Sequence, residues 1–395
     1  MRTKILIAAL GSLALSGCIT PVKYGKVRHA DYVADPRCTA QPGAAVDGAT
    51  LPLFFATSRL PDCRTDDIRL LRHRGDRMRY GRFAAPVEVK IGRDKALRTP
   101  LAFQDTADWW RALQAETDRK QGRVLLYVHG YRETFETTSK DAAQIQRMTG
   151  FDGPVIEYSW PSQGEILGYA VDETNMYHDV RNFRDFLKTL AERPWVKEII
   201  IVSHSLGARL VVPAIAYVDR ASPTADSSNI SNIILASPDI DRETFERDIA
   251  GDVLAPARVA RGRHINVYVS LKDKALAASR ALHGYPRLGS PYCFDPFEAA
   301  DLQAKGLPAR CYPVEISGMT VIDTTDISRT STGHSNFLRS AVACRDFVDV
   351  VAGKRARPER IATELAHVFR LVPDPSVPKD GDDAICNRVP TAELP

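Results

Sequence analysis

The chain has 395 residues, of which 44% are hydrophobic and 26% charged. This composition is that of an ordinary folded protein, and it excludes a disordered or fibrous chain. The 53 basic and 49 acidic residues leave a formal net charge of +4, and no block of like charge is long enough to follow a nucleic-acid backbone. We therefore expect no nucleic-acid partner.

The first residues have the pattern of a secretory signal. Arg2 and Lys4 precede an apolar run over residues 5–15, and small residues follow it. A stable membrane-spanning helix needs about 20 apolar residues, so this run predicts a cleaved signal rather than a permanent span. We expect the signal peptide to cover residues 1–17.

Residues 15–18 read Leu-Ser-Gly-Cys, which resembles the lipobox of bacterial lipoproteins. The resemblance implies cleavage before Cys18 and acylation of Cys18, and several acyl chains anchor a protein stably in a membrane. Ile19, in place of an Asp, favours the outer membrane over retention in the inner one. We therefore expect a lipid-anchored protein of the bacterial cell envelope that faces the periplasm; an ordinary secreted protein is the alternative.

Six cysteines remain after Cys18, and an oxidising periplasm permits three disulfides. Six cysteines allow 15 pairings, and the sequence does not choose among them. Proximity along the chain favours Cys38 with Cys63, Cys293 with Cys311, and Cys344 with Cys386. Since no Cys-x-x-Cys spacing occurs, we expect no metal site.

The remaining chain divides into a tether, one domain and a tail. Residues 18–50 carry the anchor and are rich in Pro, Ala, Gly and Asp, residues 51–371 form the expected domain, and residues 372–395 form a tail rich in Pro and Asp. From residue 124 short apolar runs alternate with helical stretches, which predicts a mostly parallel sheet with helices on both faces. The expected strands are 53–57, 83–91, 124–128, 155–158, 199–202, 233–235, 265–269 and 314–323. The expected helices are 138–149, 177–191, 206–218, 274–282, 335–352 and 358–370.

An apolar strand runs directly into a small-residue turn at residues 199–207, which read IIIVSHSLG. This is the pattern of a nucleophile elbow, Gly-x-Ser-x-Gly, in which a sharp turn presents a serine above the sheet. Ser203 stands where the motif has its first glycine, and it is small enough for the same turn. The pattern therefore predicts Ser205 as a nucleophile; the alternative is a serine that only caps a helix.

An elbow serine needs backbone amides to stabilise an oxyanion. Leu206 follows the serine and supplies the first amide. Strand 124–128 ends in His129 and Gly130, where the glycine permits close backbone approach, so Tyr131 is expected to supply the second. His129 is expected to be structural, because it belongs to a strand end.

The base and the acid of a triad follow the serine in this chain order. Among the four later histidines we expect His334 to be the general base, because it lies in a polar loop after the last predicted strand, while His283 is the substrate-side alternative. His264 and His367 are expected to be structural. Asp273, a few residues after strand 265–269, is the favoured acid, and Asp239 after the preceding strand is its competitor.

Several segments together resemble the bacterial α/β-hydrolase family known as DUF900, over roughly residues 51 to 350. The resemblance implies the α/β-hydrolase fold and a hydrolase activity, and says little about the substrate. Asp239, Arg287 and Arg209 belong to these segments and are expected to form a buried ion-pair network. The segments that carry the resemblance are 55–59, 80–81, 129–131, 134–135, 158–161, 203–209, 236–241, 273, 275–276, 287–289 and 333–337.

The sequence therefore predicts a serine hydrolase of ester or related acyl bonds that needs no metal or other cofactor. Its substrate would be a small or lipid-like acyl compound, and its N-terminal lipid would hold it at a membrane. A second hypothesis is an envelope lipoprotein that uses the hydrolase fold only for binding or assembly. A third is cleavage of amide or thioester bonds by the same triad. The acyl group and the oligomeric state are not determined by the sequence.

Overall fold

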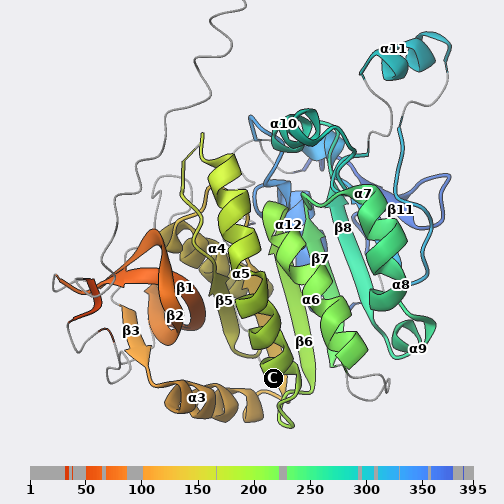
Figure 1. The fold of residues 1–395 in the computed structure, drawn as a ribbon. Helices are drawn as coiled ribbons and strands as arrows, with labels where there is room; N and C mark the ends of the chain where they lie inside the picture. Colours follow the sequence, from red (N-terminus) through yellow and green to blue (C-terminus); the bar gives the residue numbers. More distant parts are fainter. Residues whose placement is uncertain are drawn as a thin grey trace, which may run out of the picture.

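The computed structural model describes residues 32–34, 38, 50–64, 68–86, 101–165, 167–221, 229–291, 296–306, 310–328, 330–354, 357–376 and 386. Their strands form one eleven-stranded sheet in the order β10-β11-β9-β8-β7-β6-β4-β5-β1-β2-β3 (Figure 1). The strands from β11 to β1 in this order are all parallel, and β2, β3 and β10 add antiparallel strands at the two edges.

The strands are β1 (Thr50–Asp62), β2 (Arg69–Pro86), β3 (Leu101–Gln104), β4 (Arg123–Val128), β5 (Val155–Ser159), β6 (Glu198–His204), β7 (Ile230–Ala236), β8 (His264–Val269), β9 (Met319–Asp323), β10 (Arg360–Ala362) and β11 (Val368–Leu371). The α-helices are α3 (Thr106–Asp118), α4 (Phe135–Thr149), α5 (Tyr169–Ala191), α6 (Ala208–Ala221), α7 (Arg242–Thr244), α8 (Ala250–Val253), α9 (Pro256–Val259), α10 (Lys274–His283), α11 (Pro296–Ala304) and α12 (Ala341–Val351).

Successive side chains of the central strands point to alternate faces of the sheet, and this divides the core into two layers. In β4, Val124, Leu126 and Val128 face one core cluster, whereas Leu125 and Tyr127 face the other, because successive side chains of a strand point to opposite faces. Helices α3, α5, α6 and α8 contribute to the first cluster, and α4 and α12 to the second (Figure 1). The sheet is thus buried on both faces, as parallel sheets usually are.

Most of the predicted strands are confirmed. The six apolar runs between residues 53 and 57 and between 124 and 269 all lie within observed strands. Strand 83–91 is observed only as the end of β2, since residues 87–91 lie outside the described part, and β9 begins at Met319 rather than at residue 314. Strand β3 and helix α3 were not predicted.

The predicted helix 358–370 is wrong. This segment forms the hairpin of β10 and β11, and Val368 pairs in parallel with Val321 of β9. Val368 and Leu371 are buried at the sheet edge, whereas Ile361 and Leu365 are exposed. Pairing with β9 therefore outweighs the local helical pattern, which is a weaker determinant than tertiary contact. The predicted helix 335–352 is also shorter than expected, because a 3-10 turn at Asn336–Leu338 precedes α12.

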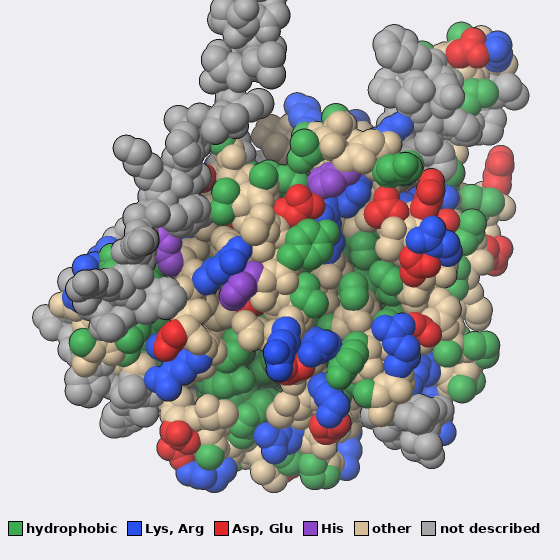
Figure 2. Space-filling view, in the orientation of Figure 1, with side chains coloured by type: hydrophobic (Ala, Val, Ile, Leu, Met, Phe, Trp, Pro, Cys, Tyr) green, Lys and Arg blue, Asp and Glu red, His purple; other side chains and the backbone are tan. Residues whose placement is uncertain are grey.

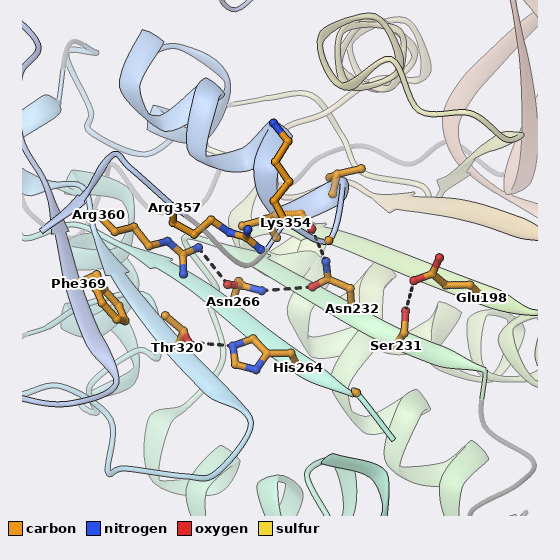
Figure 3. Close-up of a pocket in the computed structure, with 14 residues that line it drawn as sticks. Glu198, Ser231, Asn232, His264, Asn266, Thr320, Lys354, Arg357, Arg360 and Phe369 are labelled. Atoms are coloured by element: carbon orange, nitrogen blue, oxygen red, sulfur yellow. Dashed lines mark hydrogen bonds between the residues drawn. The ribbon is translucent and has the colours of Figure 1, made fainter. Parts of the chain in front are cut away.

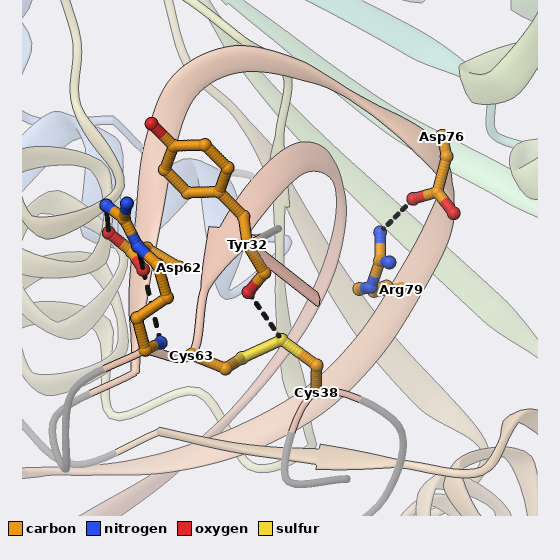
Figure 4. The surroundings of a disulfide bond; sticks show 7 residues. Tyr32, Cys38, Asp62, Cys63, Asp76 and Arg79 are labelled. Carbon is orange, nitrogen blue, oxygen red and sulfur yellow. Dashed lines mark hydrogen bonds and ion pairs between the residues drawn. A yellow bond between two sulfur atoms is a disulfide. The ribbon is translucent and has the colours of Figure 1, made fainter. Parts of the chain in front are cut away.

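Two of the predicted disulfides are present, Cys38–Cys63 and Cys344–Cys386. The first ties the segment before β1 to the end of that strand (Figure 4). The amide of Cys63 also donates to the carbonyl of Tyr32 at 3.1 Å. Cys311 is also disulfide-bonded, and its predicted partner Cys293 lies outside the described residues. The predicted signal peptide and Cys18 lie outside them too.

Charges of both signs are interspersed over the face that α5, α6 and α8 form (Figure 2). In the described part of the chain, no helix combines the length and the apolar character needed to cross a membrane.

Candidate active site

The turn after β6 holds Ser205 in a strained backbone conformation. Its φ is +50°, a left-handed value that non-glycine residues rarely adopt, and the side chain lies at the carboxyl end of the sheet. Gly207 follows so closely that a Cβ there would lie 2.5 Å from the carbonyl oxygen of His129. Helix α6 then begins at Ala208. This strand, strained serine and helix have the geometry of a nucleophile elbow.

The loop after β4 passes directly over this turn. A Cβ added to Gly130 would lie 2.8 Å from Cβ of Ser205, so only glycine permits this approach. Tyr131 follows, and its hydroxyl donates to the carbonyl of Glu165 at 2.8 Å. Gly130 thus brings the loop that carries Tyr131 against the turn that carries Ser205 and Leu206, the two segments in which the sequence predicts an oxyanion hole.

Asp172, in the first turn of α5, anchors the loop after β4. Its carboxylate accepts the amide of Arg132 at 3.0 Å, the amide of Gln163 at 2.6 Å and the hydroxyl of Ser162 at 2.6 Å. Arg132 has a φ of +65°, so its bond to Asp172 holds a strained residue of this loop. Asp172 is not marked by any local sequence motif, because its partners lie up to 40 positions away in the chain.

Arg59 holds the same loop from the side of β1. The guanidinium is fully buried and donates to Oγ of Ser159 at 2.9 Å and to the carbonyls of Ser162 at 3.0 Å and Glu133 at 2.9 Å. Burial lowers the pKa of Arg59 to about 10, which still leaves it charged at neutral pH. In the sequence, Arg59 stands out only as the last residue of segment 55–59, one of those that resemble the DUF900 family.

Asp273 and His334 are in direct contact. Nδ1 of His334 donates to Oδ2 of Asp273 at 2.8 Å, and Oδ1 of Asp273 accepts the amide of Leu276, so the aspartate also caps α10. The Asp273 side chain has no exposed area, and 14% of that of His334 is exposed. Burial acts to lower the pKa of His334, but the charge and hydrogen bond of Asp273 outweigh it and raise that pKa above its ordinary value.

His204 packs against His334. The two ring centroids are 4.7 Å apart, and Nε2 of His204 donates to the carbonyl of His334 at 3.3 Å. Burial and the positive charge that His334 acquires lower the pKa of His204 to about 3. His204 therefore stays neutral at physiological pH and connects the elbow to the loop that carries His334.

His204, the residue before Ser205, links the elbow to His334. Within the described residues, no hydrogen bond links Oγ of Ser205 to a ring nitrogen of His334, and the two are connected through His204, which precedes the serine. Catalytic hydrogen bonds are often long in unliganded enzymes and shorten when substrate binds.

A family model described as alpha/beta hydrolase of unknown function, DUF900, matches residues 106–351 of this chain. The chain belongs to this family. The family description and the parallel sheet together give the α/β-hydrolase fold, and they support a hydrolase activity. No curated protein matches the chain.

Solved structures similar to this DUF900 hydrolase include three esterases. An esterase from Pyrobaculum calidifontis is 11% identical, with 70% of this chain and 80% of that chain covered and a TM-score of 0.31. An ester-hydrolase from the metagenome of Lake Arreo is 12% identical, with 88% and 95% covered and a TM-score of 0.33. Carboxyl esterase 2 from Tuber melanosporum is 12% identical, with 81% and 90% covered and a TM-score of 0.31.

Asp239, the competing acid of the DUF900 hydrolase, lies in the expected ion-pair network. Its Oδ1 accepts Nε of Arg287 at 2.7 Å and lies 3.5 Å from Nη2 of Arg209, and its Oδ2 accepts the hydroxyl of Tyr169 at 2.6 Å. Burial acts to raise the pKa of Asp239, but Arg287 and Arg209 outweigh it and lower that pKa. The backbone amide of Asp239 donates to the carbonyl of Ser205 at 3.0 Å, so the residue at the centre of this network also holds the backbone of the elbow.

Four further histidines contact residues other than Asp273. His283 lies 3.0 Å from Oε1 of Glu173, at the end of α10. His129 is buried and stacks on Trp160 with ring centroids 4.7 Å apart, and burial lowers its pKa well below the ordinary value. His264 contacts Oγ1 of Thr320, and His367 contacts the carbonyl of Pro313.

No group of three or more His, Cys, Asp or Glu side chains suited to hold a metal ion is found among the residues that the structure describes.

Proposed function

We propose that this DUF900 protein is a serine hydrolase that cleaves an ester or related acyl bond of a small or lipid-like substrate. Ser205 would be the nucleophile, His334 the general base and Asp273 the residue that orients the base. The observation that carries the proposal is the 2.8 Å hydrogen bond between Asp273 and His334 beside a serine with a φ of +50°. A strained elbow serine and a paired histidine are the parts that acyl transfer needs.

In the proposed reaction, Oγ of Ser205 attacks the acyl carbon while Nε2 of His334 takes its proton. Asp273 holds the proton on Nδ1, so that Nε2 is the free acceptor, and its charge stabilises the imidazolium that forms. The amides of Tyr131 and Leu206 would donate to the oxyanion. His334 then protonates the leaving group. Water takes the place of that group: it gives a proton to His334, attacks the acyl carbon and frees Ser205, which recovers the proton from His334.

The positioning residues support this role for the loop after β4. Asp172 and Arg59 make six hydrogen bonds to the loop and its neighbours, all between 2.6 and 3.0 Å. Oxyanion donors contribute to catalysis only when they are fixed before the reaction, because no energy is then spent on reorganising them. A loop held this firmly meets that condition.

The test is hydrolysis of short and long p-nitrophenyl esters by the full chain, together with labelling by a fluorophosphonate. We expect ester hydrolysis and one label, located on Ser205 by mass spectrometry of the digested protein, and Ser205→Ala should lose both. Ser203→Ala is a matched control two residues away: Ser203 is fully buried, and its hydroxyl has no hydrogen-bond partner in the described structure. That variant should keep activity and labelling.

A stably folded wild type that neither hydrolyses the esters nor reacts with the fluorophosphonate would contradict the proposal. A binding or assembly role for the hydrolase fold would then be the better account. Preference for p-nitrophenyl thioesters or anilides over the esters would keep the triad and change the substrate class.

We also propose that Cys18 carries a lipid that anchors the protein in the bacterial envelope, facing the periplasm from the outer membrane. The support is the Leu-Ser-Gly-Cys sequence at residues 15–18, at the end of the apolar run. Growth with radiolabelled palmitate should label the wild-type chain and leave the Cys18→Ser variant unlabelled. Equal labelling of the two would contradict the anchor.

A further inference from the structure

A cavity lies at the amino ends of the strands, away from the carboxyl ends that carry the candidate active site. It has a volume of about 610 Å³ and opens at the amino ends of β6 to β9, where Glu198, Asn232, His264 and Thr320 line it (Figure 3). Ser205 lies at the carboxyl end of β6, which has seven residues. At about 3.3 Å per residue the two sites are roughly 20 Å apart. The cavity therefore does not belong to the candidate active site.

One wall of this cavity is cationic. Lys354, Arg357 and Arg360 follow α12 and extend into β10, and Figure 3 shows them along one side of the cavity. Arg360 pairs with the buried Asp346 at 2.7 Å, and Lys354, whose side chain is 60% exposed, pairs with Asp349 at 2.6 Å. Both carboxylates lie outside the lining of the cavity. The three cationic residues thus line the cavity, whereas the carboxylates that pair with Arg360 and Lys354 do not.

The positive charges that line the cavity lower the pKa values of their neighbours. Burial and the charge of Arg360 lower the pKa of Arg357. Burial, Arg360 and Arg357 lower the pKa of His264, so this imidazole is neutral at pH 7 and can both donate and accept. An anion placed between these groups would relieve their repulsion.

A chain of ordered polar groups runs beside the cationic wall and is joined to it through Arg360. Arg360 donates to Oδ1 of Asn266 at 3.1 Å, Asn266 donates to Oδ1 of Asn232 at 3.2 Å, and Asn232 donates to the carbonyl of Val350 at 2.8 Å (Figure 3). Each amide has two N–H donors and two acceptor lone pairs, so one bond to each group leaves capacity for a ligand. Phe369 adds a flat apolar surface beside Arg360, whose guanidinium carbon lies 5.8 Å from the centre of the ring (Figure 3).

These features differ from those of a purely structural ion-pair cluster. Protein interiors have few voids larger than a water molecule, whereas small-molecule sites measure about 300–1,000 Å³ and hold a few convergent polar groups. A cavity of about 610 Å³ is much larger than one inorganic phosphate needs, and its lining has cations and neutral hydrogen-bonding groups. Its one carboxylate, that of Glu198, is paired with Arg123 at 2.6 Å. An organic ligand with an anionic end and several hydroxyls would match the cations and the hydrogen-bonding groups.

We propose that this cavity binds a hydroxylated organic anion about the size of a monosaccharide, with its phosphate or carboxylate at Lys354, Arg357 and Arg360 and its hydroxyls at the chain of polar groups beside them. The proposal is independent of the hydrolase function, because no residue of the candidate active site lines the cavity.

Isothermal titration of the full chain with glucose 6-phosphate, gluconate and glucose tests the proposal. At least one anion should bind one-to-one with a Kd below about 1 mM, and glucose should bind at least tenfold more weakly. Glucose 6-phosphate and gluconate distinguish a phosphate from a carboxylate. Arg357→Gln should weaken binding of the anion at least tenfold, and Lys354→Gln should weaken it by a smaller factor.

Arg370→Gln is the matched control, because Arg370 lies on the same hairpin, outside the cavity lining, 3.7 Å from Asp326. It should bind the anion as the wild type does. Failure of both anions to bind, equal binding of glucose, or an unchanged Kd in a folded Arg357→Gln would overturn the proposal. If Arg357→Gln does not fold, Lys354→Glu takes its place, since that exposed side chain can be reversed in charge without disturbing the core, and retained anion binding would then overturn it.

Discussion

The loops after β7 and β8 each bring an aspartate to the carboxyl edge of the sheet, but the two carboxylates have different partners. Asp239 binds Arg287 and lies near Arg209, and its pKa is lowered. Asp273 binds His334 and the amide that starts α10. A carboxylate neutralised by arginines is a structural element, whereas one that holds a histidine can control a proton. The partner, rather than the position after a strand, therefore distinguishes the two aspartates.

The largest effect is expected from Asp273→Asn. The amide keeps the shape of the side chain but favours the wrong tautomer of His334 and cannot stabilise an imidazolium, so kcat for ester hydrolysis should fall by roughly 10⁴-fold. Steady-state kinetics on a p-nitrophenyl ester measure this loss, with thermal unfolding as the check on folding. A fall of less than tenfold in a folded variant would exclude Asp273 as the triad acid.

Asp239→Asn should act on stability instead. Removing one partner of a buried ion pair leaves the other charge uncompensated, so the free energy of unfolding should fall by about 3–5 kcal/mol. Any fall in kcat should be far smaller than that caused by Asp273→Asn. Urea unfolding and ester kinetics on the same preparations separate the two effects. The reverse pattern, with activity lost and stability kept, would transfer the triad role to Asp239.

Gly333→Ala should separate Asp273 from His334 without changing either residue. Gly333 has a φ of +66°, and a Cβ there would lie 2.5 Å from the carbonyl oxygen of Lys272. The loop of His334 must then shift, and a misplacement of about 1 Å can cost roughly 10²-fold in kcat. Gly284→Ala is the matched control, because Gly284 has a φ of +81° and no atom within 4 Å of its added Cβ. Equal kinetics of the two variants would contradict this role of Gly333.

The smallest effect concerns the pH dependence. Asp273 raises the pKa of His334, and a general base acts only when neutral, so kcat/KM of the wild type should rise as the pH increases through this pKa. Asp273→Asn removes the raising charge, so the acidic limb of its residual activity should move to lower pH. The same pairing stabilises the fold below the unfolded pKa of histidine, and this contribution is lost as pH rises through the folded pKa. An unmoved acidic limb would show that Asp273 does not control this titration.

The parts of the fold predicted from the sequence are those encoded by contiguous residues. The apolar runs at 124–128 and 199–202 are short, rich in β-branched or aromatic residues and followed by glycine-containing turns, which is the local pattern of buried strands. The turn from His204 to Gly207 is equally local, because the small residues that it needs are consecutive in the sequence. The carboxyl edge of the sheet and the candidate nucleophile follow from these two patterns.

The tertiary structure decided what depends on partners far apart in the chain. Residues 368–371 became a strand because β9 offered an edge to pair with, and residues 360–362 pair with that strand in turn. Asp172 and Arg59 became loop anchors because folding places them beside Ser162 and Glu133. The cationic cavity likewise joins residues from β7, β8, β9 and the segment after α12. The sequence by itself therefore determined the strands and the elbow, since their interactions are local; the tertiary structure decided which charges lie together, since burial and distance set those energies only after folding.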